Sequence, residues 1–209
     1  NRIKKGRAAT GMVALEMETV NQDSMQILKY WRCPMISCID PEANTGMDDD
    51  FAWMPSELNY EEIIKSIPFS WNIDLLAEQN LNLPSPTVNV DSSVIVQAGD
   101  SITCAPELVR MTGNIAITHT DASQSYLKKR LVYGGHTISL VYAQFVRAFP
   151  NIITLIGWQK CDHTAPVLEE DIINSEFQIM KIKPVEKGTL YEVKAQAYST
   201  RTVSYTHLR

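Results

Sequence analysis

The chain has 209 residues, of which 44% are hydrophobic and 8% aromatic, a composition typical of globular proteins with one sizeable core or two small ones. Its formal net charge of −5 comes without any block of lysine or arginine, so nothing in the sequence favours binding to nucleic acid or to an anionic membrane. The longest apolar stretches fall short of the ~20 residues that a membrane-spanning helix needs. We therefore expect a soluble cytoplasmic protein that has neither nucleic acid nor a membrane as partner.

Cysteine and histidine usage argues against a metal site. The cysteines form no CxxC pair and are too sparse for a disulfide framework, so we expect reduced core residues. The histidines form no HxxxH or HxH pair. The residues concerned are Cys33, Cys38, Cys104 and Cys161, and His119, His136, His163 and His207.

The N-terminal region predicts a β-hairpin across residues 11–36. Two apolar runs, 12–20 and 27–35, are rich in β-favouring side chains, and the polar residues 21–24 between them are typical of a turn. A lone hairpin cannot bury a face of its own, so we assign residues 1–37 to the last strands of a first domain. The absence of an initiating Met favours an upstream segment that completes this domain.

Residues 38–90 are interpreted as an interdomain linker with local structure. Clusters of Pro, Asp and Asn and the acidic run 48–50 interrupt any regular pattern, and one modest helical stretch spans residues 56–67. The large aromatic residues of this linker are expected to pack on neighbouring structure; they are Trp53, Phe69 and Trp71.

A more regular pattern fills residues 91–200. It begins with a strand at 94–98 and a short helix at 105–112, which has Pro106 in its first turn. A long helix follows at 134–149. Its apolar residues are spaced to share one helical face, and they are Ile138, Tyr142, Phe145 and Phe149.

Pro150 ends this helix, and three predicted strands follow at 152–161, 172–182 and 190–198. One strand, a long apolar-faced helix and then a meander of strands is the order of an α+β hotdog fold, in which an antiparallel sheet wraps a central helix. The last nine residues, 201–209, do not continue the apolar alternation, and we interpret them as a non-native tail.

Residues 111–122 resemble the catalytic segment of the MaoC-like acyl-CoA dehydratases and hydratases. In that family the segment reads Gly-Asp-x-Asn-Pro-x-His, followed by x-Asp, and its Asp and His form the catalytic pair. Gly113, His119 and Asp121 fall in register with it, whereas Asn114 stands where the catalytic Asp is expected. The resemblance implies His119, Asn114 and Asp121 as the catalytic candidates.

Two further segments carry the same resemblance. Residues 130–140 contain Tyr-Gly-Gly-His at 133–136 and are similar to the β-methylmalyl-CoA dehydratase and mesaconyl-CoA hydratase branch. Residues 164–171 are similar to the family's Arg-Pro-Val-x-x-Gly-Asp turn, with Glu170 where Gly is usual. Together the three segments cover roughly residues 90–200 in the right order, which is more specific than any one of them.

The resemblance implies the second hotdog of a double hotdog that acts on acyl-CoA. It implies no cofactor apart from the coenzyme A of the substrate. It also implies a pseudo-dimer with the preceding half or a homodimer.

The residues that enter the long helix have a physical rationale as a substrate site. Gly134 and Gly135 would let a ligand approach the backbone closely, and the free N–H groups of a helix start favour an oxygen with negative charge. Polarising a thioester carbonyl there would stabilise the enolate-like charge that develops during hydration. Tyr133 and His136 complete this set of substrate-binding candidates. The alternative is that the glycines only permit tight helix packing.

Hydration also needs a base to activate water and an acid to protonate the α-carbon. His119 suits either step, although a lone histidine is often structural. Asn114 cannot accept a proton, but its amide could hold the water or the tautomer of the histidine. Asp162 and His163 are adjacent in a predicted strand, so their side chains point to opposite faces and we interpret both as structural.

Three functions remain open. The first is a hydro-lyase that reversibly hydrates an enoyl-CoA. The second is a non-catalytic hotdog half that completes the acyl-CoA tunnel, because Asn114 replaces the catalytic acid. A hotdog thioesterase ranks last, since residues 134–149 contain no acidic side chain. No feature of the sequence identifies the acyl group.

Overall fold

A computed structural model describes residues 10–40, 42, 44, 46–80, 84, 86–114, 116–125, 127–186 and 188–201. The chain divides into two compact units, Asn1–Glu57 and Leu58–Arg209, each of which is described by itself. Residues 202–209 of the predicted tail lie outside the described residues, and so does His207, whereas the first residue of that tail, Arg201, forms an ion pair with Asp171 of the second unit.

The first unit contains the predicted hairpin. Strand β1 pairs antiparallel with β4, and β2 pairs antiparallel with β3, so the chain reverses its direction at the turn between β2 and β3. The predicted turn is confirmed, because the Asn21 side chain accepts hydrogen bonds from the backbone N–H groups of Asp23 and Met25, both at 2.9 Å. Pro34, which has no N–H to donate, lies where the ladder is interrupted. The strands are β1 (Thr10–Met12), β2 (Leu15–Val20), β3 (Gln26–Arg32) and β4 (Met35–Ser37).

Trp53 packs on this hairpin, as expected for a linker aromatic. Its ring meets that of Trp31 edge-on, with 6.4 Å between the centroids. Several large apolar side chains of the hairpin stay exposed, among them Met12, Ile27 and Ile36. This exposure agrees with a two-stranded ribbon that cannot bury a face of its own.

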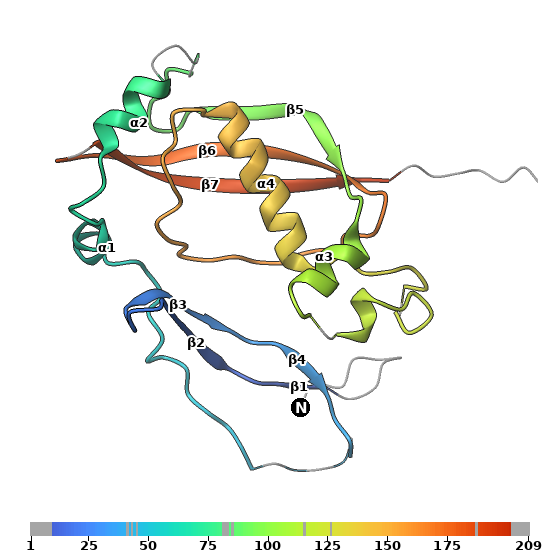
Figure 1. The fold of residues 1–209 in the computed structure, drawn as a ribbon. Helices are drawn as coiled ribbons and strands as arrows, with labels where there is room; N and C mark the ends of the chain where they lie inside the picture. The colour runs from blue at the N-terminus through green and yellow to red at the C-terminus, as the bar shows by residue number, and fades with distance from the viewer. Residues whose placement is uncertain are drawn as a thin grey trace, which may run out of the picture. The chain divides into compact units, whose positions relative to one another are not determined.

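The second unit is built on an antiparallel sheet with the order β5-β6-β7. The strands are β5 (Ser93–Ser101), β6 (Ile172–Val185) and β7 (Gly188–Thr200), and they confirm three predicted strands. The predicted long helix is α4 (Gly134–Ala148), which runs across one face of this sheet (Figure 1). Alternate residues of β6, from Ile173 to Ile179, are buried on that face.

The predicted apolar stripe of α4 divides between two environments. Phe145 and Phe149 pack in the core with Phe177 of β6, and the ring centroids of Phe145 and Phe177 are 5.0 Å apart. Ile138 and Tyr142 instead line an open groove on the unit's surface.

The middle of the buried face of α4 is polar. Gln144 is fully buried, and its amide donates to Asp100 at 2.7 Å and to the carbonyl of Ile173 at 2.8 Å. These bonds satisfy the NH2 group of the buried amide, whereas its Oε1 has no partner among the described residues. The apolar periodicity alone could not reveal this burial.

Besides α4, the second unit contains short helices. The predicted helix at 105–112 is confirmed as α3 (Ala105–Met111), which buries Ala105 and Val109. The linker holds α1 (Tyr60–Ser66), inside the predicted stretch 56–67, and also α2 (Ile73–Asn80), which was not predicted. The signal for α2 was available, because the Asn72 side chain accepts from Leu75 N at 3.1 Å as a cap would.

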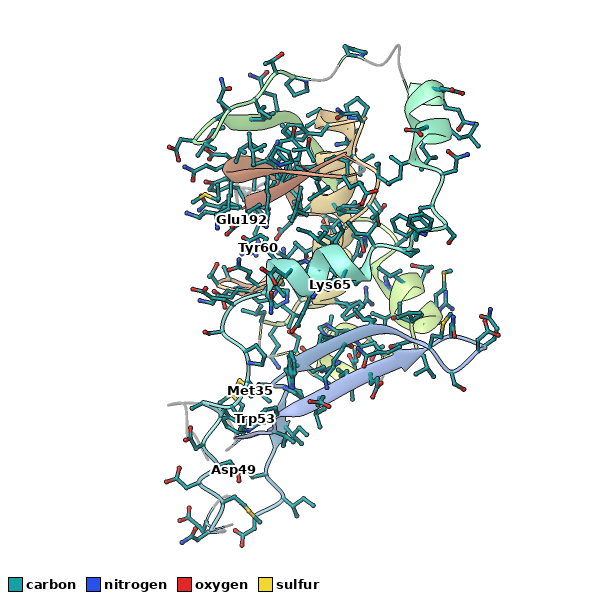
Figure 2. All side chains as sticks on the ribbon, turned by 90° about the vertical axis from the view of Figure 1, so that its left-hand side faces the viewer. Met35, Asp49, Trp53, Tyr60, Lys65 and Glu192 are labelled. Carbon is teal, nitrogen blue, oxygen red and sulfur yellow. The ribbon has the colours of Figure 1, made fainter. Side chains whose placement is uncertain are left out.

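The prediction of a strand at 152–161 is wrong. This segment forms no ladder with its neighbours among the described residues. A side chain ties it to the sheet: Gln159 donates to Glu192 of β7 at 3.3 Å. The hydroxyl of Tyr60, in α1, donates to the same carboxylate. Figure 2 shows Tyr60 and Glu192 close together. A segment with an alternating apolar pattern forms a strand only where a neighbouring strand can hydrogen-bond to its backbone in register. Here the segment bonds to the sheet through a side chain instead.

The expectation of core cysteines is also wrong. Cys33, Cys104 and Cys161 are exposed, and Cys38 is half-buried. Cys104 precedes α3 in a left-handed conformation, which places it at a helix start instead of in the core.

Candidate functional site

The candidate site centres on the junction between an extended segment and α4, which we call the junction and define as residues 131–136. Leu131 N donates to the carbonyl of Thr118 at 3.1 Å, and Val132 N donates to the carbonyl of Val167 at 2.9 Å. Leu131 also forms a bridge with Leu168. Because successive N–H groups of an extended chain point in opposite directions, two flanking segments hold the junction from two sides. One flank contains His119, and the other leads back to His163.

His119 lies in the short 3₁₀ helix η1 (Ile117–His119) and is fixed by the junction itself. Its Nδ1 is 2.8 Å from the carbonyl oxygen of Leu131, which can only accept a hydrogen bond. The proton of the neutral ring therefore sits on Nδ1, and Nε2 keeps its lone pair. The ring also meets that of Tyr133 edge-on, with 6.0 Å between the centroids. This tautomer is the one that a general base needs.

Asn114 lies before η1 and is bound locally. Its Oδ1 accepts from Ala116 N at 3.0 Å, and its own N–H donates to the carbonyl of Val109 at 3.1 Å. The carbonyl of Leu131, and not the amide of Asn114, holds the tautomer of His119 in this structure.

Asp121 follows η1 and caps the next turn. Its Oδ1 accepts from the hydroxyl of Ser123 at 2.7 Å and from the N–H of the same residue at 2.8 Å. These hydrogen bonds hold the pKa of Asp121 below its ordinary value. The carboxylate is therefore ionised at neutral pH and committed to a local turn, and no bond joins it to His119 within the described part of the chain.

Arg130 ties the two flanks together, a role that sequence reasoning missed. Its Nε donates to the carbonyl of Thr120 at 3.1 Å, and its guanidinium forms an ion pair with Glu169 on the other flank. Both side chains are partly buried. The pair fixes the spacing of the two segments around the junction.

The space beside both glycines of the junction is filled by rings of the protein. A Cβ atom on Gly134 would lie 2.7 Å from Cε1 of His163, and one on Gly135 would lie 2.7 Å from the ring of Tyr133. The glycines therefore admit these rings, in a place where the sequence suggested an open approach to the backbone. In the described part of the chain, the N–H groups of Gly134 and Gly135 have no hydrogen-bond partner.

Two further histidines belong to the junction. His136 has a buried Nδ1 without a hydrogen-bond partner among the described residues, and burial lowers the pKa of this imidazole, so it is neutral. His163 is exposed and rests on Gly134, although sequence reasoning interpreted it as structural. Its neighbour Asp162 pairs with Lys160 at 2.9 Å.

An apolar groove begins one helical turn beyond the glycines. It has a volume of about 370 Å³, and a second pocket of about 490 Å³ shares Thr154 with it. The first is lined by Ile138, Ser139, Tyr142, Thr154, Leu155 and Trp158. Three of these residues, Ile138, Ser139 and Tyr142, lie on α4, the helix that begins at the junction.

The described residues contain no group of three or more His, Cys, Asp and Glu side chains placed to hold a metal ion. None of the helices in that part of the chain is long and apolar enough to cross a membrane.

Comparison with known proteins identifies the fold. The sequence matches no protein-family model and no curated protein. Among solved structures, 98% of the chain matches the double-hotdog protein RV0216 of Mycobacterium tuberculosis, which is essential for bacterial survival during infection, with 31% identity and a TM-score of 0.75. A protein of Chloroflexus aurantiacus, provisionally described as a MaoC-domain dehydratase, matches 95% of the chain with 20% identity and a TM-score of 0.74.

The R-hydratase PhaJ1 of Pseudomonas aeruginosa, at 14% identity and a TM-score of 0.41, is too distant to inform the fold or the function. The chain spans 61% and 58% of the lengths of the first two structures.

These likenesses confirm the predicted hotdog fold. In fold, the chain belongs with the MaoC-like hotdog proteins. The neighbours do not single out the β-methylmalyl-CoA dehydratase branch.

Proposed function

We propose that the protein hydrates an enoyl-CoA, or dehydrates a 3-hydroxyacyl-CoA, as a hydro-lyase. The observation that carries this proposal is the state of His119, whose Nδ1 donates to the carbonyl of Leu131 and whose Nε2 keeps a lone pair beside the start of α4. A histidine held in this tautomer is suited to take a proton from water.

The remaining parts of the reaction fall to the backbone of the junction. The N–H groups of Gly134 and Gly135 would donate to the thioester oxygen and stabilise the negative charge that it gains when water attacks the β-carbon. The rings of Tyr133 and His163, which now lie against the glycines, would border the bound thioester. The acyl chain would lie in the apolar groove along α4.

The proposed partner is therefore an acyl-CoA, and coenzyme A enters only as part of this substrate. The hairpin of the first unit supports completion of the site by a first hotdog half or by a second copy of the protein, because its apolar side chains are exposed. We place the reaction in the cytoplasm.

A second candidate is a non-catalytic half that shapes the acyl-CoA tunnel. Asn114 favours it, because an amide stands at the position of the family's catalytic acid and is bound to Ala116. A thioesterase is less favoured. The carboxylate bonded to α4, that of Asp100, is paired with Arg147 at 2.7 Å and so is not free to act as a base or nucleophile.

The test is an assay of the purified full-length protein with crotonyl-CoA and mesaconyl-CoA. We expect the enoyl-thioester absorbance to fall and a 3-hydroxyacyl-CoA to form. Binding of both thioesters without turnover would support the scaffold candidate instead, and release of free coenzyme A would support a thioesterase. The proposed function would be overturned if the protein neither binds these thioesters nor converts them.

A further inference from the structure

We propose that His163 is a second acid–base residue of this site and supplies the proton that Asn114 cannot. The inference rests on the proposed hydration reaction. It assigns a role in the chemistry to a side chain that carries none of the sequence resemblance.

The position of His163 is the first observation. Its ring would be 2.7 Å from a Cβ on Gly134, so it lies in van der Waals contact with the first turn of α4. Adjacent helical residues project about 100° apart, so the ring on Gly134 and the ring of Tyr133 on Gly135 occupy neighbouring sides of this turn. His119 contacts the Tyr133 ring. The two histidines thus approach the junction from its two flanks.

The absence of a competing acid is the second observation. Asp121 is committed to Ser123, and Glu169 is paired with Arg130. Asp162, next to His163 in sequence, is turned toward Lys160. Burial keeps His136 neutral, so it carries no proton to give from an imidazolium. Within the described part of the chain, His163 and Tyr133 are titratable side chains that reach the glycines without another polar partner. Of these two types of side chain, the imidazole is the one that can exchange a proton near neutral pH.

Exposure is the third observation. His163 is exposed to solvent, so its imidazole can regain a proton after each turnover. Imidazole is the side chain that gains and loses a proton near neutral pH, which a general acid at this position requires.

The proposed step is balanced as follows. Nε2 of His119 accepts a proton from water as the water oxygen bonds to the β-carbon. The π electron pair of the C=C bond moves toward the thioester, and the imidazolium of His163 donates its proton to the α-carbon. The product has gained one water molecule. His119 then loses its proton to solvent, and His163 takes one up.

The experiment compares three variants of the full-length protein in the crotonyl-CoA hydration assay across pH. His163→Gln keeps a polar side chain but cannot act as an acid, and His163→Phe keeps a ring against Gly134. Both should lower kcat by roughly 10²–10⁴, the usual contribution of general acid–base catalysis. If an imidazole acid contributes to the rate, the pH profile of the wild type should have a limb that His163→Gln lacks.

Asp162→Asn is the matched control, because it changes the adjacent residue, whose side chain points to Lys160. We expect its kcat and pH profile to stay within a few-fold of the wild type. Circular dichroism of all three variants checks that the fold is retained.

The outcomes separate the two proposals. If the wild type hydrates crotonyl-CoA and His163→Phe matches it, the ring only packs against Gly134, and the role of His163 is overturned while the proposed function stands. If the wild type neither hydrates nor binds crotonyl-CoA, the proposed function itself is wrong. The NMR signals of the His163 ring supply an independent readout: crotonyl-CoA should shift them, and unchanged signals with the thioester bound would overturn the inference.

Discussion

Two polar clusters of the second unit, one around Asp171 and one at the junction, differ in how fully their atoms are bonded. The carboxylate of Asp171, which is 2% exposed, accepts from Ser199 Oγ at 2.6 Å, Arg201 Nε at 2.8 Å and Leu168 N at 2.9 Å. At the junction, by contrast, Nδ1 of His136 is buried without a partner among the described residues. A saturated cluster stabilises a fold, whereas an unsatisfied buried atom lacks a partner in the free protein, as do Oε1 of Gln144 and Oγ of Ser175 among the described residues.

The two clusters also depend on each other. The Asp171 cluster fixes Leu168, and Leu168 forms the bridge with Leu131 at the start of the junction. The segment that carries His163 is therefore anchored a few residues beyond it by an ion pair between the buried Asp171 and the partly exposed Arg201. A site held in this way keeps its geometry without using its own histidines for structure.

Removal of His119 is the strongest test of whether the junction, unlike the Asp171 cluster, acts in catalysis. If Nε2 is the general base, His119→Ala in the full-length protein should lower kcat by roughly 10²–10⁴ with crotonyl-CoA as substrate. Its loss should cost little stability, because one hydrogen bond, to the carbonyl of Leu131, disappears. Steady-state kinetics and a thermal melt measure the two effects.

Thr120→Ala is the control for that variant, since its hydroxyl bonds only the carbonyl of Ile117 beside the same 3₁₀ helix. We expect its turnover to stay within a few-fold of the wild type. Near-normal turnover of His119→Ala itself would identify this hotdog as a scaffold half, with catalysis located elsewhere in the full-length protein.

The Asp171 cluster should respond in the opposite way. Asp171→Ala removes a buried carboxylate and leaves the guanidinium of Arg201 without its partner, and Arg201 is 42% exposed. Because water can solvate part of that charge, we expect a loss of about 2–3 kcal/mol, below the ~3–5 of a fully buried pair. Urea unfolding should show a lower midpoint at an unchanged slope. Asp162→Asn, in an exposed pair with Lys160, should stay within about 0.5 kcal/mol.

The stability that the Asp171 cluster contributes should also depend on pH. Burial alone would raise the pKa of Asp171, but the bonds from Arg201, Ser199 and Leu168 N outweigh it and hold the pKa below its ordinary value. This contribution to stability is therefore present above the unfolded pKa of about 3.9 and is lost as the pH falls toward the folded pKa. Urea midpoints between pH 6 and 3 should fall less in Asp171→Asn than in the wild type. Equal slopes would show that other carboxylates control the acid limb.

The sequence predicted the elements whose physics is local. The periodicity of residues 134–149, the turn at 21–24 and Pro106 in a first turn each act within one element, and α4, the hairpin and α3 all appear. The segment at 152–161 failed because a strand needs a neighbour in register, which no local pattern contains. The burial of Gln144 was invisible for the same reason, since its partners Asp100 and Ile173 are distant in sequence.

The site shows the same limit. The family resemblance made His119 and the glycines candidates, but the partners of these residues come from elsewhere in the chain. The carbonyl of Leu131 sets the tautomer of His119, Arg130 joins the flanks, and His163 covers Gly134. Asp162 and His163 lie against different neighbours, Lys160 and Gly134, although the strand from which their separation was expected does not form.

The smallest expected effect concerns Asp121, which the family resemblance places among the catalytic candidates. Its carboxylate is bonded to Ser123, both N–H and hydroxyl, in the manner of the saturated Asp171 cluster and unlike the junction histidines. Asp121→Asn keeps an acceptor oxygen for Ser123 N and removes only the charge. We therefore expect turnover within about threefold of the wild type and a urea midpoint that hardly changes. Crotonyl-CoA kinetics beside a urea titration measure both. A drop in kcat of a hundredfold or more with the midpoint unchanged would show that bonding within the free protein does not distinguish structural from catalytic carboxylates here, because Asp121 would then have to leave its turn and act on the substrate.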